Sequence, residues 1–410
     1  MDGHLPHYDS LVQPSVDRPN PPSTPRIRVL LVTKSLGHGG AERLLVDLAS
    51  NGDRGRFEYQ VALVLESEDA FVPAIESQGI VVHRLGATHN LDLRWLTTFR
   101  RLVLGQRFDI VHFHLPYSAA LGRPVALSIP RRLRPVTFYT EHSMWDRVSP
   151  LVKLLNRATI KFDAEVIAVS QAALDALPGP VGRRARVLEH GVDLSASSEL
   201  VEMRSHVRTA VRAELEVPDG TLLALTVANL RSEKGYDVLL ECAGSPNIRN
   251  LPIVFVAAGS GGLTEELADR HRALGLGARF RFLGHRGDVL ALMTAADLVI
   301  LPSHQEGLPV VLMEATSVGA TIVATSVGGV PQIITDGVNG LLVPPGRPEE
   351  LAAAIERLWS DPELRSALGR QAAAERGRFD VTRAGAEIER LYRSHVPRPG
   401  RPSLPSEPGS

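Results

Sequence analysis

The sequence predicts an α/β protein made of two doubly wound, Rossmann-like domains that face each other across a cleft. Short, continuous apolar runs alternate with helix-length segments, a pattern typical of buried parallel strands joined by helices. The alternation forms two series, which meet near residue 195. The chain has 410 residues, more than one ordinary core accommodates. Two domains of similar size are therefore expected.

The first series begins at Ile27, after a proline-rich stretch without apolar periodicity. Its runs are IRVLLVT, YQVALVL, GIVVHRL, FDIVHFH, PVTFYTE, AEVIAVS and ARVLEHG. The second series comprises LLALTVA, PIVFVAAG, ARFRFLG, DLVILPS, TIVATS and GLLVP, with helices expected at 237–243 and 349–359. The small, polar stretch 195–202 lies between the two series, so we interpret it as the linker.

These patterns divide the chain into five parts. The segments 1–25 and 397–410 are rich in proline and polar residues, and such composition buries too little apolar surface to fold. Both are expected to be disordered tails. The predicted ordered parts are an N-terminal domain at 26–197, a C-terminal domain at 198–379 and a final helix at 380–396.

Composition excludes several classes of protein. Apolar residues make up 44% of the chain and charged residues 22%, as in soluble globular proteins. The net charge of -1 gives no general attraction to nucleic acid. The single cysteine, Cys242, rules out intramolecular disulfides, and no apolar run reaches the length of a membrane span. A cytoplasmic protein is expected, and a peripheral position on the inner membrane face stays open.

The segment SHQEGLPVVLMEA, residues 303–315, begins as a polar loop and continues as an apolar helix. It follows the run DLVIL, so the loop stands at the carboxyl end of a strand, where open parallel sheets bind ligands. Pro309 suits the first turn of the helix, whose free amide groups bind anions. Because helical side chains lean towards the helix start, Glu314 should point to the same place as Glu306.

A carboxylate can accept two hydrogen bonds from a vicinal diol. The pair Glu306 and Glu314 therefore predicts one glutamate for each of two polyols, with phosphates between them. The alternative is that Glu306 is an ordinary exposed loop residue and Glu314 an ordinary residue on an amphipathic helix.

A second cluster, VANLRSEKGYDVLLEC, also follows an apolar run. It places Arg231 and Lys234 in a short loop that enters a helix near Gly235. Two cations in the cleft could neutralise a diphosphate without a metal ion. The alternative is a pair of solvated loop charges.

The third cluster, TKSLGHGGAERLLVDLA, contains Gly37, Gly39 and Gly40. A dinucleotide-binding fingerprint would need a further glycine where Glu42 stands. The glycines still allow the backbone to approach a ligand closely at a helix start. A tight turn without a ligand is the alternative.

Histidines supply the last signal. His114 and His142 both stand at carboxyl ends of predicted strands and should face the cleft, whereas His112 is expected in the core. The sequence has no Asp-x-Asp pair and no His, Cys and carboxylate spacing that indicates a metal site. No metal or other cofactor is therefore expected.

Taken together, the motifs resemble those of the family 4 retaining glycosyltransferases, which have the GT-B fold. EGLPVVLME resembles the Glu-x7-Glu signature of that family. Its other blocks are matched in order by GHGGAER, DIVHFHLP, TEHS, AVSQAAL, EHGVD, LRSEKGYDVLL, AAGSG, FLGHRGDV and GGVPQIITDGVNGLLVPPG. The resemblance covers nearly all of residues 27–395.

The resemblance implies that the C-terminal domain binds a UDP-, GDP- or ADP-linked sugar, that the N-terminal domain binds a sugar, polysaccharide or lipid-linked acceptor, and that the final helix crosses back to the N-terminal domain. It implies metal-independent transfer of a hexosyl-type sugar with retained anomeric configuration. The implied catalytic residues are His142 and Glu306. The implied donor-binding residues are Gly40, Arg231, Lys234, Gly307, Leu308 and Glu314, and the implied acceptor-side residues are Glu42 and His114.

Three other functions are compatible with parts of this pattern. A sugar-nucleotide epimerase could use the same scaffold, and a non-catalytic subunit could bind a sugar nucleotide. A nicotinamide dehydrogenase is disfavoured by Glu42 in the glycine-rich turn.

A basic stretch between residues 131 and 161 adds a question about partners. Its basic residues are Arg131, Arg132, Arg134, Arg147, Lys153, Arg157 and Lys161, against the acidic Glu141 and Asp146. A solvated helix face is the ordinary interpretation. The alternative is contact with an anionic membrane surface.

Overall fold

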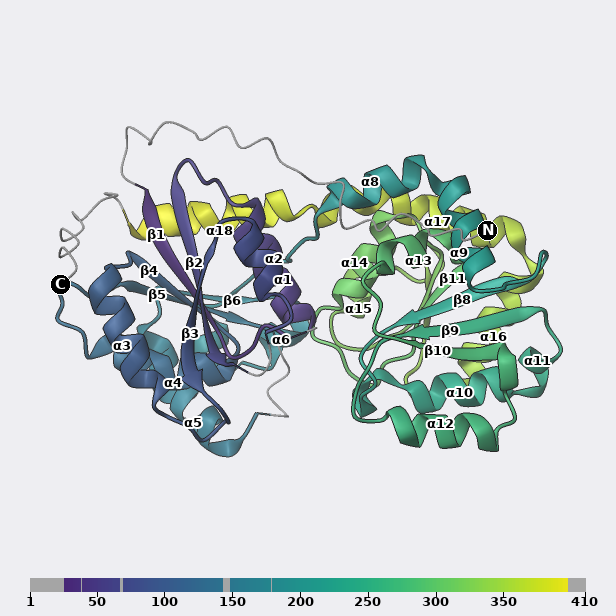
Figure 1. Ribbon diagram of the computed structural model, residues 1–410, viewed down its shortest axis with the longest axis horizontal. Coiled ribbons are helices and arrows are strands. Elements are labelled where there is room, and N and C mark those ends of the chain that lie inside the picture. Colours follow the sequence, from purple (N-terminus) through teal and green to yellow (C-terminus); the bar gives the residue numbers. More distant parts are fainter. Residues whose placement is uncertain (1–25, 38, 67–68, 143–147, 178, 397–410) are drawn as a thin grey trace, which may run out of the picture.

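The computed structural model describes residues 26–37, 39–66, 69–142, 148–177 and 179–396. The predicted tails 1–25 and 397–410 lie outside this range, as do Asp146 and Arg147 of the basic stretch. The described residues form two parallel sheets, one in each half of the molecule, with helices packed around them (Figure 1). This is the two-domain α/β architecture that the sequence predicts.

The N-terminal half holds a seven-stranded sheet with the order β3-β2-β1-β4-β5-β6-β7. Its strands are β1 (Ile27–Thr33), β2 (Phe57–Leu65), β3 (Val81–Ala87), β4 (Ile110–His114), β5 (Val136–Glu141), β6 (Glu165–Ala168) and β7 (Arg186–Val187). Its helices are α1 (Gly40–Asn51), α2 (Val72–Ser77), α3 (Trp95–Gln106), α4 (Pro116–Leu127), α5 (Pro150–Thr159), the short 3₁₀ helix η3 (Ile160–Phe162), α6 (Gln171–Asp175) and α7 (Gly179–Gly182).

Strand β1 lies inside this sheet, paired in parallel with β2 on one side and β4 on the other. Its apolar residues alternate between two cores. Val29 and Leu31 belong to the core under α1, while Leu30 and Val32 belong to the core under α3. The strand is apolar throughout because both of its faces are covered, which is why its sequence shows no polar alternation.

The C-terminal half holds a six-stranded parallel sheet with the order β10-β9-β8-β11-β12-β13. Its strands are β8 (Leu222–Val227), β9 (Ile253–Ala258), β10 (Phe280–Gly284), β11 (Leu298–Leu301), β12 (Ile322–Thr325) and β13 (Leu341–Val343). Its helices are α8 (Leu194–Glu202), α9 (Arg204–Glu214), η4 (Ser232–Lys234), α10 (Tyr236–Gly244), α11 (Pro246–Arg249), α12 (Thr264–Ala273), η5 (Gly277–Arg279), α13 (Val289–Ala295), α14 (Val310–Ser317), α15 (Val330–Ile333), α16 (Pro348–Ser360), α17 (Pro362–Glu375) and η6 (Arg376–Phe379).

The segment 195–202, interpreted from the sequence as a linker, is helical instead. It forms most of α8, which packs against α13 and α14 of the C-terminal half. The Asp193 side chain accepts a hydrogen bond from Ser195 N at 2.8 Å and caps the helix. The hydroxyl groups of Ser197 and Ser198 donate to the Leu194 carbonyl. The small polar residues therefore support the helix start rather than a flexible connection.

The chain passes between the halves at two places that lie side by side. Val192 N donates to the Phe379 carbonyl at 2.8 Å, and Val381 N donates to the Val192 carbonyl at 3.1 Å. Gly191 is required here, because a Cβ atom on it would lie 2.5 Å from the backbone of Asp380.

After the second passage, α18 (Val381–His395) packs against α1 of the N-terminal half (Figure 1). The Glu389 carboxylate accepts from Asp53 N at 2.7 Å and from the Tyr59 hydroxyl at 2.9 Å. Among the helices that the structure describes, none is both long enough and apolar enough to traverse a bilayer.

Candidate active site

A cleft of about 470 Å³ lies between the two halves, at the carboxyl ends of both sheets. The predicted site residues that line it are Gly40, His142, Lys234, Glu306, Gly307, Leu308 and Glu314. The predicted residues that do not line it are Glu42, His114 and Arg231. The structure thus brings together the central part of the predicted site from segments far apart in the sequence.

Glu306 lines the cleft and is only 7% exposed. Its Oε1 atom accepts from Lys234 Nζ at 2.8 Å and from Ser303 Oγ at 2.6 Å. Among the described residues, Oε2 accepts no hydrogen bond. A buried carboxylate with one fixed and one available oxygen is suited to accepting a hydrogen bond from a hydroxyl group of a ligand.

The loop that carries Glu306 is shaped by two glycines that sequence reasoning did not single out. Gly328 has a φ of 51°, and a Cβ atom there would lie 1.8 Å from the Glu306 carbonyl oxygen. Gly329 N donates to the Gly307 carbonyl at 2.9 Å. Only glycine allows this close approach. The loop is therefore held rigidly from behind, and its backbone amides meet the cleft at the start of α14.

Glu314 lies on helix α14, which follows the Glu306 loop, and it lines the same cleft. The helix begins at Val310, with Pro309 as its cap, one residue later than the sequence suggests. Burial raises the pKa of the Glu314 carboxyl to about 7, although the nearby Arg43 guanidinium opposes the rise. The carboxyl forms no hydrogen bond with the described residues, so its oxygens remain available to a ligand.

Arg43 was not predicted as a site residue, yet it lines the cleft from the opposite half. Its Nε atom donates to both oxygens of Asp47, at 3.0 and 3.1 Å, one turn along α1. Asp47 is 4% exposed, so it anchors the guanidinium. Arg43 is thus the N-terminal half's cation opposite Glu314. The signal in the sequence was the Arg-x3-Asp spacing just after the glycine-rich turn.

The glycine-rich turn lies at the junction of the halves. Gly40 is the first residue of α1, and a Cβ atom on it would lie 3.3 Å from Val310 on α14. Gly39 abuts Glu42, whose side chain occupies the space of a Cβ atom there. Glu42 turns back and accepts from Ser35 Oγ at 2.8 Å. It therefore orders the turn, while the backbone at Gly40 meets the cleft.

Four buried histidines form a row behind the cleft. His114 Nδ1 lies 2.9 Å from His142 Nε2, and the two rings are stacked. His112 hydrogen-bonds to Thr140 and, at 2.5 Å, to the Tyr392 hydroxyl of α18. His190 lies 5.5 Å from His142, ring centre to ring centre. Burial lowers the pKa of all four rings, that of His190 to about 4.

Within this row only His142 lines the cleft, and its Nδ1 atom has no hydrogen-bond partner among the described residues. His114 is 1% exposed and contacts His142 rather than the cleft. His112 is fully buried, as expected from the sequence. Nowhere in the described chain do three His, Cys, Asp or Glu side chains come together as metal ligands.

Arg231 is exposed and lies outside the lining of the cleft, whereas Asn229, two positions earlier, lines it. The cleft is also lined by His285 and Arg286, from the block FLGHRGDV, which were not predicted individually. Arg286 is held by Glu214 and Asp288 at 2.6 Å each. Strand alternation alone did not indicate which residues of these loops turn inward.

Each half of the chain matches a sequence model of glycosyltransferases. A sequence model described as Glycosyltransferase Family 4 matches residues 38–196, and one described as Glycosyl transferases group 1 matches residues 207–375. The D-inositol 3-phosphate glycosyltransferase of Saccharomonospora viridis is 34% identical over 315 residues, which are 70% of each chain. The alpha-D-kanosaminyltransferase of Streptomyces kanamyceticus is 27% identical over 322 residues, covering 75% of this chain and 83% of its own.

Among solved structures, HepE of Anabaena in complex with UDP and glucose superimposes with a TM-score of 0.78 at 25% identity. The match covers 90% of this chain and 100% of HepE. Because the sequence matches span both sheets and the structural match spans the whole two-domain arrangement, the chain belongs to the family 4 glycosyltransferases and has their GT-B fold.

Proposed function

We propose that this glycosyltransferase moves a hexosyl sugar from a nucleoside-diphosphate sugar to a hydroxyl acceptor, with retention of anomeric configuration. One observation carries the proposal: Glu306 and Glu314 lie on a single loop and helix and line the same cleft, with Lys234 bonded to Glu306. Each carboxylate has an oxygen available for a polyol, and the amides at the start of α14 stand between them.

The donor is bound across this unit. The ribose hydroxyls meet Glu314, and the diphosphate lies against Lys234, Gly40 and the amides of Gly307 and Leu308. A helix start favours an anion through its free N–H groups and its dipole. The donor sugar then reaches Glu306, whose Oε2 atom accepts a hydrogen bond from one of the sugar hydroxyls. Arg231 joins the diphosphate only if its loop turns inward.

The acceptor enters from the N-terminal half, where His142 faces the reacting centre. His114 acts through its hydrogen bond to His142, and Glu42 acts through the turn that it orders with Ser35. In the transfer step, the bond between the anomeric carbon and the leaving phosphate oxygen breaks while the acceptor oxygen bonds to the same face. The leaving phosphate takes the acceptor's proton. Lys234 and the loop amides neutralise the charge that develops on the diphosphate, without a divalent cation.

The substrates follow by class. HepE binds UDP and glucose, so a uridine-linked hexose is the first donor to test. One relative is named for inositol 3-phosphate, in keeping with a polyhydroxylated acceptor. We place the reaction in glycolipid, polysaccharide or glycoconjugate biosynthesis.

The test is a thermal-shift panel of UDP-, GDP- and ADP-sugars, followed by product analysis with and without acceptor. A true donor at 100 times its Kd should stabilise the protein by about 2.7 kcal/mol. Transfer with retained configuration, seen by NMR of the product, supports the proposal. An altered sugar nucleotide formed without acceptor would indicate an epimerase, and binding without turnover would indicate a non-catalytic subunit.

A further inference from the structure

Helix α5 is amphipathic, but it is turned the opposite way from an ordinary surface helix. Leu151 and Leu154 are each 65% exposed, and Phe162 of the adjoining η3 is 52% exposed. They recur at helical spacing and so share one face. The residue that α5 buries completely is polar, Asn156. A helix usually buries its apolar stripe and exposes its polar one, so this arrangement leaves apolar surface to be covered.

The orientation of α5 is fixed by a buried polar network. Arg123 of α4 is fully buried, and its Nη1 atom donates to Asn156 Oδ1 at 3.0 Å and to Thr159 Oγ1 at 2.7 Å. The same guanidinium pairs with Asp163 at 2.7 Å, and both side chains are 0% exposed. Rotating the leucines inward would break the bonds to Asn156 and Thr159 and leave a buried Arg123 donor and the buried Asn156 amide without partners, which is costly. The apolar face is therefore held outward.

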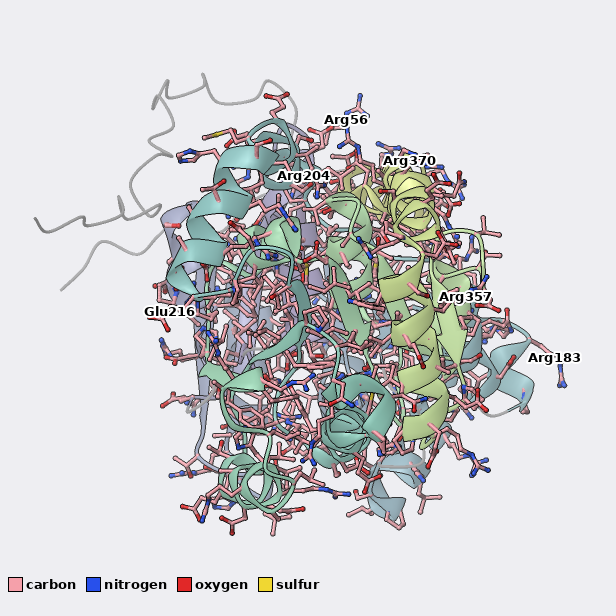
Figure 2. The ribbon with its side chains drawn as sticks, turned by 90° about the vertical axis from the view of Figure 1, so that its right-hand side faces the viewer. Arg56, Arg183, Arg204, Glu216, Arg357 and Arg370 are labelled. Atoms are coloured by element: carbon pink, nitrogen blue, oxygen red, sulfur yellow. The ribbon has the colours of Figure 1, made fainter. Side chains whose placement is uncertain are left out.

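The exposed face is bordered by positive charge. Residues 148–162 contain Lys153, Arg157 and Lys161 and no acidic residue. Lys161 Nζ lies 5.2 Å from the centre of the Phe162 ring. Arg184 donates to the Lys161 carbonyl, and its neighbour Arg183 projects from the surface in Figure 2. Basic residues thus flank the apolar stripe and extend beyond its end.

We propose that the exposed face of α5 and η3 docks on the surface of an anionic lipid bilayer. Leucine and phenylalanine side chains partition into the boundary between headgroups and acyl chains, and the flanking cations meet acidic headgroups. A second copy of the chain fits less well, because a two-fold contact through this face would bring the same basic flank of both copies together. The inference stands independently of sugar transfer. If the proposed function also holds, docking here brings a lipid-linked hydroxyl to the half of the cleft that contains His142.

The test is co-sedimentation of the full chain with vesicles of phosphatidylcholine alone or mixed with phosphatidylglycerol. We expect recovery on the anionic vesicles at low salt and release at high salt, because exposed charges are screened. The double variants Leu151→Ser with Leu154→Ser, and Arg157→Glu with Lys161→Glu, should each lower the partition coefficient roughly tenfold or more. Nucleotide binding should not change in either variant.

The matched controls are Met203→Ser and Arg370→Glu, an exposed apolar and an exposed basic residue of the C-terminal half. Met203 is 49% exposed, and Arg370 lies on α17, where Figure 2 labels it. Both should sediment like the unmodified protein. Circular dichroism establishes that each variant is folded.

Three results would overturn the proposal. The first is equal recovery on neutral and anionic vesicles, or on neither. The second is unchanged binding in both double variants. The third is a concentration-dependent dimer in light scattering that the leucine variant abolishes, which would assign the face to self-association.

Discussion

Lys234 Nζ lies 2.8 Å from Glu306 Oε1, although the two residues are 72 positions apart in the sequence. They stand on the loops that follow β8 and β11, which are neighbours in the sheet. The lysine proposed for the diphosphate thus also orients the glutamate proposed for the sugar. Binding of a diphosphate would draw Lys234 away from Glu306 and leave that carboxylate freer to accept a sugar hydroxyl.

Lys234→Ala should weaken binding of both the free nucleoside diphosphate and the nucleotide sugar. A hydrogen bond to a charged group contributes roughly 1.5 to 3 kcal/mol, so the loss is on the order of ten- to a hundredfold in Kd. Arg231→Ala is the matched comparison, because Arg231 is exposed and outside the cleft lining; its effect should be smaller. Titration calorimetry measures both. A larger loss for Arg231→Ala would mean that the loop rearranges and that Arg231 is the main phosphate ligand.

Glu314→Gln should change how stability depends on pH. Burial raises the pKa of Glu314 from 4.5 to about 7, so the folded state favours the protonated form. That stabilisation is complete below pH 4.5 and is lost as the pH rises through 7. At pH 8.5 the free energy of unfolding of the variant should exceed that of the unmodified protein by about 3 kcal/mol, and at pH 4.5 the two should agree closely. Urea unfolding at several pH values measures this, and parallel curves would contradict it.

The four buried histidines should make stability rise with pH, opposite to the effect of Glu314. Burial lowers the pKa of His112, His114, His142 and His190, so each is neutral when folded and binds a proton on unfolding. Their contribution is present above pH 6.5 and is lost as the pH falls. The protein should therefore be less stable at pH 5.5 than at pH 7.5, as measured by urea unfolding.

Unfolding is best followed in the Glu314→Gln background, because Glu314 titrates in the same range. Adding His190→Asn should lessen the acid-induced loss of stability between pH 7.5 and 5.5. An unchanged loss in that variant would mean that His190 is protonated in the folded state.

Transfer should persist in excess EDTA. Lys234 and the amides at the start of α14 supply the positive charge that a divalent cation would otherwise provide. The measurement is the initial rate of product formation before and after chelation. Complete loss of activity that manganese restores would show that the diphosphate needs a metal partner.

The fold was largely predictable because its strands are covered on both faces. Runs such as IRVLLVT of β1 are largely apolar, and this pattern can be recognised in the sequence without knowing which helices cover the sheet. The pairing of Lys234 with Glu306 could not be predicted, because it depends on β8 lying next to β11 in the sheet. Glu306 and Glu314 were predictable together, since a single loop and helix positions both.

The linker predicted at 195–202 is a helix in the structure, and the reason is local. Its serines are typical of loops, but Asp193 caps the segment and two serine hydroxyls bond back to Leu194. For α5 the sequence predicts amphipathicity but not which face is buried. That choice depends on Arg123, which lies 33 positions before Asn156 in the chain.

In the proposed donor site, Glu306 binds the donor sugar and Glu314 binds the ribose. The most direct test of this claim is calorimetric binding of the free nucleoside diphosphate of the donor found by thermal shift, in Glu306→Gln and Glu314→Gln side by side. Glu314→Gln should weaken this binding by roughly ten- to a hundredfold. Glu306→Gln should leave it unchanged or tighter, because Lys234 is released from its carboxylate partner, while transfer collapses. If Glu306→Gln, folded by circular dichroism, loses the bare nucleotide as fully as Glu314→Gln does, the claim is wrong.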